Sequence, residues 1–226
     1  MNAPLRSPHA AAPWIFDPLP MLAFDVIMVD PPWSFDNWSE GGNAKNAKAQ
    51  YECMPTAAIA ALPVGYLARG DAWLWLWATY PMLPDALRCM DAWGFRFVTA
   101  GPWIKRGASG RLAMGTGYVL RSCSEIFLLG KVGEPRTFSR SIRNVIEAPR
   151  RQHSRKPDEA YATCEALFGP ARRADLFSRE SRPGWSSWGR EAGKFDAGAP
   201  SADAVAHSAV LTPEPAPAPL LAFGGM

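Results

Sequence analysis

The chain has 226 residues, a formal net charge of +3 and 48% hydrophobic residues, so it can form one domain with a sizeable core and is short for two. No apolar run reaches membrane-spanning length and no secretory or lipidation signal is visible, so we expect a soluble, cytoplasmic protein. The four cysteines lack any CxxC pair and the three histidines are scattered, so we expect free thiols and no metal site.

The first predicted element is a strand over residues 24–30 (FDVIMVD), an apolar run that ends in a carboxylate. Such a run is typical of a central parallel strand that is buried on both faces. Pro31 and Pro32 end the strand because neither can donate a hydrogen bond to a sheet. Asp30 is therefore expected at the carboxyl end of a core strand, where open α/β sheets bind their ligands.

Helices and strands alternate after a long polar loop at residues 34–50. The predicted helices cover residues 56–62 with Thr56 as N-cap, 83–93 before Gly94, and 157–168 before Gly169. The predicted strands cover residues 72–78, 95–105, 125–129 and 173–177. This alternation predicts an α/β fold with a doubly wound, mostly parallel sheet and helices on both faces.

The two ends differ in composition from the middle of the chain. Residues 195–226 are rich in Ala, Pro and Gly and contain no Lys or Arg, so they cannot bury enough apolar surface to offset the entropy of ordering. We expect a disordered tail there, a flexible segment over residues 1–12, and one folded domain over residues 13–194.

Positive charge is dense between residues 136 and 156. Seven basic residues accompany a single acid, Glu147; they are Arg136, Arg140, Arg143, Arg150, Arg151, Arg155 and Lys156. The run is either a solvated charged face or a surface that meets phosphates. Among the ten tryptophans, Trp73, Trp75 and Trp77 alternate along one strand and are expected in the core.

The four residues Asp30-Pro31-Pro32-Trp33 fit the methylation of the adenine N6 amine, whose lone pair is delocalised into the ring. The Asp30 carboxylate and the Pro31 carbonyl can accept the two amine hydrogens, and the prolines stiffen the turn that aims them. Trp33 can stack on the purine, outside the core. A bare Asp-Pro-Pro can also simply end a strand; Trp33 and the buried strand before it favour catalysis.

Several further motifs accompany these four residues. They are Tyr51 with Met54, LWLWAT at 74–79, WIKR at 103–106, Gly117-Tyr118 with Arg121, Glu125, Leu128 and Gly130, HSRKPDE at 153–159, DLFSR at 175–179, PGW at 183–185 and WG at 188–189. With DPPW at 30–33, their content and order resemble the MT-A70 family of adenine-N6 methyltransferases over most of residues 24–191.

The resemblance implies a circularly permuted, Rossmann-like class I methyltransferase fold, because the catalytic motif comes first and the cofactor motif last. It implies S-adenosylmethionine as the cofactor, with Lys156 at its methionine carboxylate and Arg179 at its ribose or carboxylate. The implied cofactor-binding residues are Asp30, Lys156, Phe177, Arg179, Ser181, Trp188, Gly189, Arg190 and Glu191. The expected residues for the target base and nucleic acid are Trp33, Tyr51, Lys105, Arg106, Arg121, Arg150, Arg151 and Arg155.

Some of these assignments have alternatives. Lys156 and Arg179 can be solvated surface charges, and Trp185 and Trp188 can be core residues instead of neighbours of the cofactor. The family usually has Asn where this chain has Arg190; the adjacent Glu191 can accept from both ribose hydroxyls.

The resemblance implies methyl transfer to adenine N6, and DNA is favoured because the domain is compact and carries no appended RNA-binding module. Two alternatives remain, an RNA adenine-N6 methyltransferase and a non-catalytic, nucleic-acid-binding partner subunit. The intact DPPW and cofactor motifs disfavour the second. We expect a monomer or homodimer that binds nucleic acid, no membrane and no metal.

Overall fold

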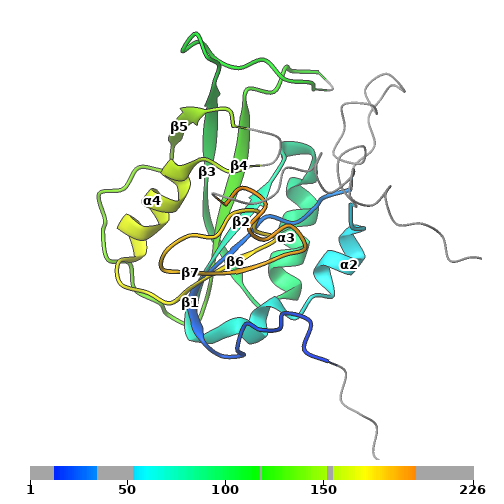
Figure 1. The fold of residues 1–226 in the computed structure, drawn as a ribbon, viewed down its shortest axis with the longest axis vertical. Helices are drawn as coiled ribbons and strands as arrows, with labels where there is room; N and C mark the ends of the chain where they lie inside the picture. Colours follow the sequence, from blue (N-terminus) through cyan, green and yellow to red (C-terminus); the bar gives the residue numbers. More distant parts are fainter. Residues whose placement is uncertain (1–12, 35–52, 118, 152–154, 197–226) are drawn as a thin grey trace, which may run out of the picture.

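The computed structural model describes residues 13–34, 53–117, 119–151 and 155–196 (Figure 1). Within them, strands form one sheet. They are β1 (Phe24–Val29), β2 (Ala68–Ala78), β3 (Arg96–Arg106), β4 (Ser124–Val132), β5 (Ile146–Pro149), β6 (Arg173–Leu176) and β7 (Trp185–Trp188). Their spatial order is β5-β3-β4-β2-β1-β6-β7, so the first strand of the chain lies inside the sheet between strands from both halves of the sequence.

Strand direction decides which residues meet at the edge of the sheet. β1 pairs in parallel with β2 and β6, β6 with β7, and β3 with β5, whereas β4 is antiparallel to both β2 and β3. The carboxyl ends of every other strand therefore meet the amino end of β4 at one edge. The side chains that follow these strands converge there, although they are far apart in the sequence.

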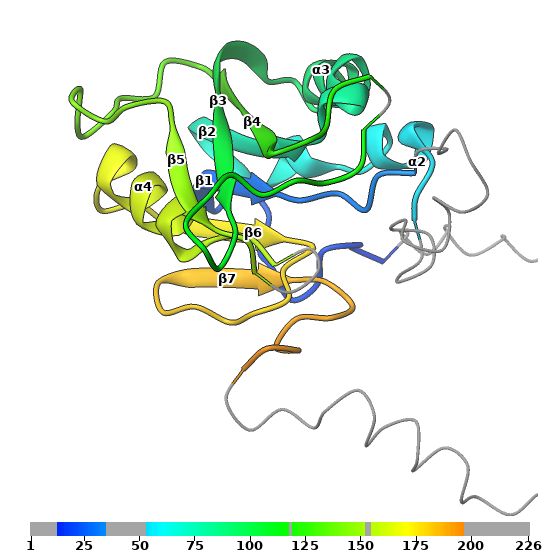
Figure 2. The same ribbon diagram turned by 90° about the horizontal axis from the view of Figure 1, so that it is seen from above.

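The two faces of the sheet carry separate halves of the core, as alternation along a strand requires. Ile27 and Val29 pack on one face with residues of α2 (Thr56–Ala60) and α3 (Leu83–Ala92). Val26 and Met28 pack on the other face with the β2 tryptophans and α4 (Asp158–Phe168). Figure 2 shows α3 and α4 on opposite sides of the sheet. The prediction of a mostly parallel α/β sheet covered on both faces is confirmed.

Three local predictions need correction. Thr56 is the first residue of α2 and not its N-cap; Pro55 occupies that position and no side chain caps the helix. The short strands β5 and β7 were not predicted. Strand β2 begins at Ala68, four residues earlier than expected, because Ala68 pairs with Phe24 of β1 before an irregularity in the register at the exposed Arg69-Gly70-Asp71 segment, which has no apolar pattern.

Both ends of the described chain pack on the domain. Phe16 is fully buried and contacts the Trp188 ring edge-on. Phe195 donates its backbone N–H to the Arg179 carbonyl, and Asp196 accepts from the Ser181 N–H at 2.7 Å. The folded part therefore continues at least two residues beyond the expected end at residue 194. The expected flexible segment over residues 1–12 and the rest of the expected disordered tail, residues 197–226, lie outside the described residues.

No helix in the described parts of the chain is both long enough and apolar enough to cross a bilayer.

Candidate active site

A cavity of about 1080 Å³ lies at the edge where the strand ends converge. Its wall includes residues that follow or end separate strands; they are Asp30 after β1, Thr79 after β2, Lys105 in β3, Arg150 after β5, Phe177 after β6 and Arg190 after β7. Glu125 joins them from the amino end of antiparallel β4. This is the place where a doubly wound sheet binds ligands.

The backbone of the DPPW segment is fixed at several points. Asp30 donates its N–H to the Leu176 carbonyl of β6 at 3.2 Å, and Met54 donates to the Pro32 carbonyl at 2.8 Å. The Pro31 carbonyl accepts the Trp33 N–H at 2.8 Å in a tight turn. A carbonyl oxygen has two lone pairs, and Pro31 can therefore still accept a second hydrogen bond.

Trp33 differs from its prediction as a ring outside the core. Only 5% of its surface is exposed, and its indole N–H donates to the Trp77 carbonyl at 3.0 Å. The ring borders the cavity but is part of the core, because the turn at Pro31 directs it back over β2. Its first role is to hold the DPPW turn against the sheet.

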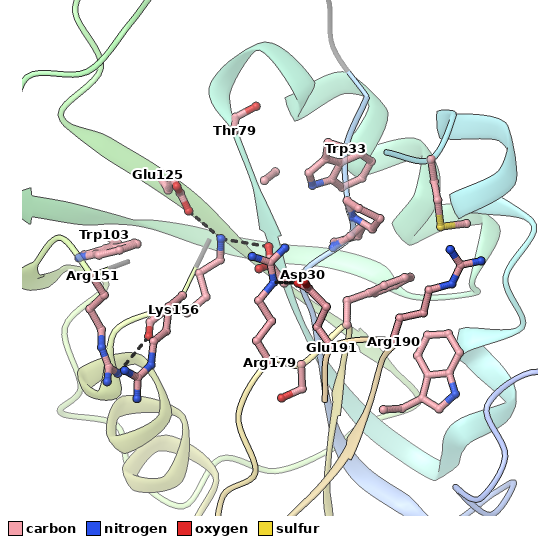
Figure 3. Close-up of a pocket in the computed structure, with 18 of the residues that line it drawn as sticks. Asp30, Trp33, Thr79, Trp103, Glu125, Arg151, Lys156, Arg179, Arg190 and Glu191 are labelled. Atoms are coloured by element: carbon pink, nitrogen blue, oxygen red, sulfur yellow. Dashed lines mark hydrogen bonds and ion pairs between the residues drawn. The ribbon is translucent and has the colours of Figure 1, made fainter. Parts of the chain in front are cut away.

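A buried lysine links two carboxylates in the cavity. Lys156 Nζ lies 3.0 Å from Asp30 Oδ1 and 2.8 Å from Glu125 Oε2, the two contacts that Figure 3 marks from this lysine. The Lys156 side chain is 10% exposed. Lys105 Nζ contacts the other Glu125 oxygen at 2.5 Å. We call Asp30, Lys156 and Glu125 the buried triad. Pairing within the triad and with Lys105 balances charges that would be costly to bury singly.

Burial and pairing act in opposite directions on these groups. Burial raises the pKa of Asp30, and Lys156 opposes that rise only in part. Burial would also raise the pKa of Glu125, but Lys156 and Lys105 outweigh it and lower the pKa to about 2. For Lys156, burial would lower the pKa, yet the two carboxylates raise it above its usual value. Lys156 is thus a cation at neutral pH, and it favours the charged form of Asp30.

The ends of β6 and β7 form the opposite wall. Phe177 has a positive φ of 62°, and Ser178 donates its N–H to the Trp188 carbonyl at 3.1 Å, so the two chain ends approach closely. A Cβ on Gly189 would lie only 3.1 Å from the Phe177 Cα, so the close approach of the two backbones favours a residue without a side chain. Arg179 Nε is 3.1 Å from Glu191 Oε2, which places a cation beside a carboxylate on this wall.

Most residues expected at the cofactor line the cavity. Those that do are Asp30, Lys156, Phe177, Arg179, Trp188, Arg190 and Glu191, together with Pro31, Pro32 and Trp33 of the catalytic motif. Ser181 and Gly189 do not line it. Ser181 is exposed and bonded to Asp196, and Gly189 acts through close backbone packing. Trp185 belongs to the core cluster against α4, whereas half-buried Trp188 faces the cavity.

The predicted phosphate-binding arginines are largely ion-paired within the protein. Arg151 contacts Asp158 at 2.6 Å, and Arg155 pairs with Glu180 through two nitrogens. Arg106 contacts Glu147 at 2.7 Å. Arg150 is exposed at the rim of the cavity.

Only some of the residues expected to contact nucleic acid line the cavity. Lys105, Arg150, Arg151 and Arg155 line the cavity, whereas Arg106 and Arg121 do not. Arg121 is exposed between β3 and β4. Tyr51 and residues 35–50 of the polar loop expected at 34–50 lie outside the described residues. Nucleic-acid contact at all these positions stays a prediction.

Sequence reasoning gave no role to several residues of the wall. Glu125 is the most important of them, and the others include Ile15, Thr79, Trp103 and Ser178. A carboxylate directly before the apolar run 126–129 was the available signal for Glu125. Its significance depends on β4 being antiparallel, because only then does the start of a strand face the site.

Comparison with known proteins agrees with this arrangement. The sequence profile of the MT-A70 family matches residues 24–191, from the start of β1 to Glu191 on the cavity wall. The chain belongs to the MT-A70 family. Among its relatives is the Type II methyltransferase M.MunI of a Mycoplasma species, 28% identical over 195 residues that cover 78% of this chain and 81% of that protein.

Other relatives are longer proteins. The Arabidopsis thaliana N(6)-adenosine-methyltransferase MT-A70-like is 31% identical over 74% of this chain, but the match covers 24% of that protein. The human N(6)-adenosine-methyltransferase catalytic subunit METTL3 is 29% identical over 74% of this chain and is covered over 28% of its length. This MT-A70 chain therefore corresponds to about a quarter of those proteins.

Across the parts of the chain that the structure describes, no group of three or more His, Cys, Asp or Glu side chains is arranged to hold a metal ion.

Proposed function

We propose that this MT-A70 protein is an S-adenosylmethionine-dependent methyltransferase that methylates the N6 amine of adenine, with DNA as the favoured substrate. The observation that carries the proposal is the position of Asp30. Its carboxylate, at the end of the central strand, enters a cavity within a backbone turn that Leu176 and Met54 hold in place. That geometry suits an acceptor aimed at a single amine.

The residues present fit the proposed cofactor. A cavity of about 1080 Å³ exceeds the usual size of a site for one small molecule, which leaves room for a cofactor and a base. Lys156 and Arg179 can bind a carboxylate, and Glu191 can accept from ribose hydroxyls. The Thr79 hydroxyl on the wall is buried without a partner among the described residues, as expected of a group that a ligand satisfies. When bound, S-adenosylmethionine supplies a methyl group on a positively charged sulfur.

The protein's own groups would act on the amine. Asp30 accepts a hydrogen bond from one amine N–H, and the second lone pair of the Pro31 carbonyl accepts a hydrogen bond from the other. These two bonds localise the lone pair of the amine nitrogen. Asp30 is the stronger acceptor while it is ionised, because hydrogen bonds to a charged oxygen are stronger than those to a neutral one. Lys156 is the main group that opposes the effect of burial on the Asp30 pKa, so it favours the charged form of the acceptor.

The preference for DNA is supported by the pattern of similarity. The match to the Type II methyltransferase covers about four fifths of both chains, whereas the N(6)-adenosine-methyltransferases are matched over about a quarter of their length. The second candidate is methylation of adenosine in RNA, which the names of those longer relatives favour. Both candidates place the same amine against Asp30.

The test is methyl transfer to matched DNA and RNA oligonucleotides, single-stranded and duplex, with the nucleosides identified by mass spectrometry. The proposal predicts N6-methyldeoxyadenosine in DNA at a rate above that of N6-methyladenosine in RNA. Faster transfer to RNA would select the second candidate. Calorimetric binding of S-adenosylmethionine with no transfer to any oligonucleotide would indicate a non-catalytic subunit, and methylation of another atom would refute the assignment of Asp30.

A further inference from the structure

The segment between β3 and β4 carries the most exposed apolar side chains that the structure describes. We call it the β3–β4 hairpin, residues 107–117 and 119–123. Val119, Leu120 and Met114 expose 93%, 83% and 77% of their surfaces, more than any other large hydrophobic residue in the described ranges. Apolar side chains that cluster on a surface mark a place where a partner binds.

The hairpin has a defined backbone conformation, with hydrogen bonds between its two arms. Gly115 donates to the Ser122 carbonyl at 2.7 Å, and Ser122 donates to the Thr116 carbonyl at 3.3 Å. A Cβ on Gly117 would lie 1.9 Å from the Leu120 carbonyl oxygen, so the tight tip requires a glycine there. The turn therefore holds Val119 and Leu120 at the end of a projection.

The hairpin is continuous with the wall of the cavity. Ala113 donates to the Lys105 carbonyl and Lys105 donates to the Cys123 carbonyl, each at 2.8 Å, so both arms are bonded to a residue that lines the site. Figure 1 shows the segment at the top of the molecule, beyond the carboxyl end of β3. A substrate whose base enters the cavity would meet this projection.

The charge of the hairpin indicates the kind of partner. It contains Arg111 and Arg121 and no Asp or Glu. Both arginines are exposed, and neither forms an ion pair with another described residue. Apolar side chains flanked by unopposed arginines complement stacked bases flanked by phosphates.

We propose that the β3–β4 hairpin is a wedge that enters the base stack of a duplex and fills the place of the target adenine after that base has left the stack. Val119 and Leu120 contact the neighbouring base pairs, with Met114 beside them, and Arg111 and Arg121 contact the phosphates. A base inside a duplex cannot reach Asp30 without unstacking, and apolar side chains inserted at the gap offset that cost. The inference rests on the proposed function and specifies the duplex form of its substrate.

The test compares the Val119→Ser/Leu120→Ser variant with wild type on the DNA site that wild type methylates, offered as a duplex and as a single strand. The control is Met21→Ser/Leu22→Ser, an adjacent exposed apolar pair before the amino end of β1, at the opposite edge of the sheet. We expect the duplex-to-single-strand ratio of kcat/KM to fall by about tenfold or more in the hairpin variant only, because the single strand needs no unstacking.

A binding measurement gives a readout that does not depend on turnover. With 2-aminopurine at the target position, wild type should raise the fluorescence of the duplex as the base unstacks, and the hairpin variant should lose at least about half of that rise. Leu120→Met, which keeps an apolar wedge, should retain both the ratio and the fluorescence.

Three results would overturn the inference. An unchanged duplex-to-single-strand ratio of kcat/KM in the hairpin variant would refute the wedge and leave the proposed function intact. A change in oligomeric mass by light scattering, with the ratio unchanged, would assign the hairpin to an interface between copies of the chain. A wild-type protein that methylates no DNA would refute the proposed function itself and the wedge with it.

Discussion

Replacement of Lys156 by Met tests whether the buried triad of the site exists in solution. Lys156 Nζ is 3.0 Å from Asp30 and 2.8 Å from Glu125, and both carboxylates are about four fifths buried. The pKa of Glu125 is lowered from 4.5 to about 2. That difference corresponds to roughly 3 kcal/mol in favour of the charged form, shared between Lys156 and Lys105.

Lys156→Met removes the larger share of that interaction and leaves two carboxylates buried near each other. We therefore expect it to lower the free energy of unfolding by about 2–4 kcal/mol at pH 7. Glu125→Gln in the same background removes one of the stranded charges, so the double variant should be less destabilised than the sum of the two single variants, with a coupling energy of at least about 1 kcal/mol.

Urea unfolding of the four proteins measures this coupling. The control cycle uses the exposed pair Arg96 and Glu134, for which the coupling should stay below about 0.5 kcal/mol. Because the folded-state pKa of Glu125 is lowered, its stabilisation is present above pH 4.5 and is lost as the pH falls toward about 2. The gap between wild type and Glu125→Gln should therefore narrow on acidification. Additive losses in the Lys156 cycle would refute the triad.

Three further predictions concern the other charged groups. Burial raises the pKa of Asp175, which accepts from Tyr161, from 3.8 to about 7, so the stability tied to its protonated form is full below pH 3.8 and is lost as the pH rises through 7. The unfolding free energy of Asp175→Asn, relative to that of wild type, should rise between pH 4 and pH 8 by roughly 4 kcal/mol at most. A difference between the two proteins that does not change with pH would contradict this. Arg150→Ala should flatten the slope of log affinity for duplex DNA against log salt by about 0.9. Arg155→Ala should instead lose about 1–3 kcal/mol of stability, because Arg155 pairs with Glu180; a flatter slope without that loss would show that Arg155 contacts phosphate.

The parts of the fold that sequence predicted are those with a strong local pattern. The apolar run before Asp30 and the two prolines after it define β1 without further information. Strands β5 (Ile146–Pro149) and β7 (Trp185–Trp188) have four residues each, and they are strands only because β3 and β6 offer an edge to pair with. No periodicity in four residues carries that information.

In the site, too, the features with a sequence motif were predicted and those that depend on the folded chain were not. The resemblance to the MT-A70 family implied that Asp30, Lys156 and Glu191 share one site, and they line one cavity. The density of positive charge could not reveal that Arg151 and Arg155 have acidic partners, because Asp158 and Glu180 become neighbours only in the folded chain. Pairing in space, and not residue type, decides which arginines are available to a substrate.

The central claim is that Asp30 acts on the adenine amine, and Asp30→Ala tests it most directly. Single-turnover methyl transfer to DNA should fall by about 10²–10³, the usual cost of removing a preorganised acceptor, while calorimetric affinity for S-adenosylmethionine changes by less than roughly tenfold. A variant that transfers methyl groups within a few-fold of the wild-type rate would show that the DPPW carboxylate does not act on the amine.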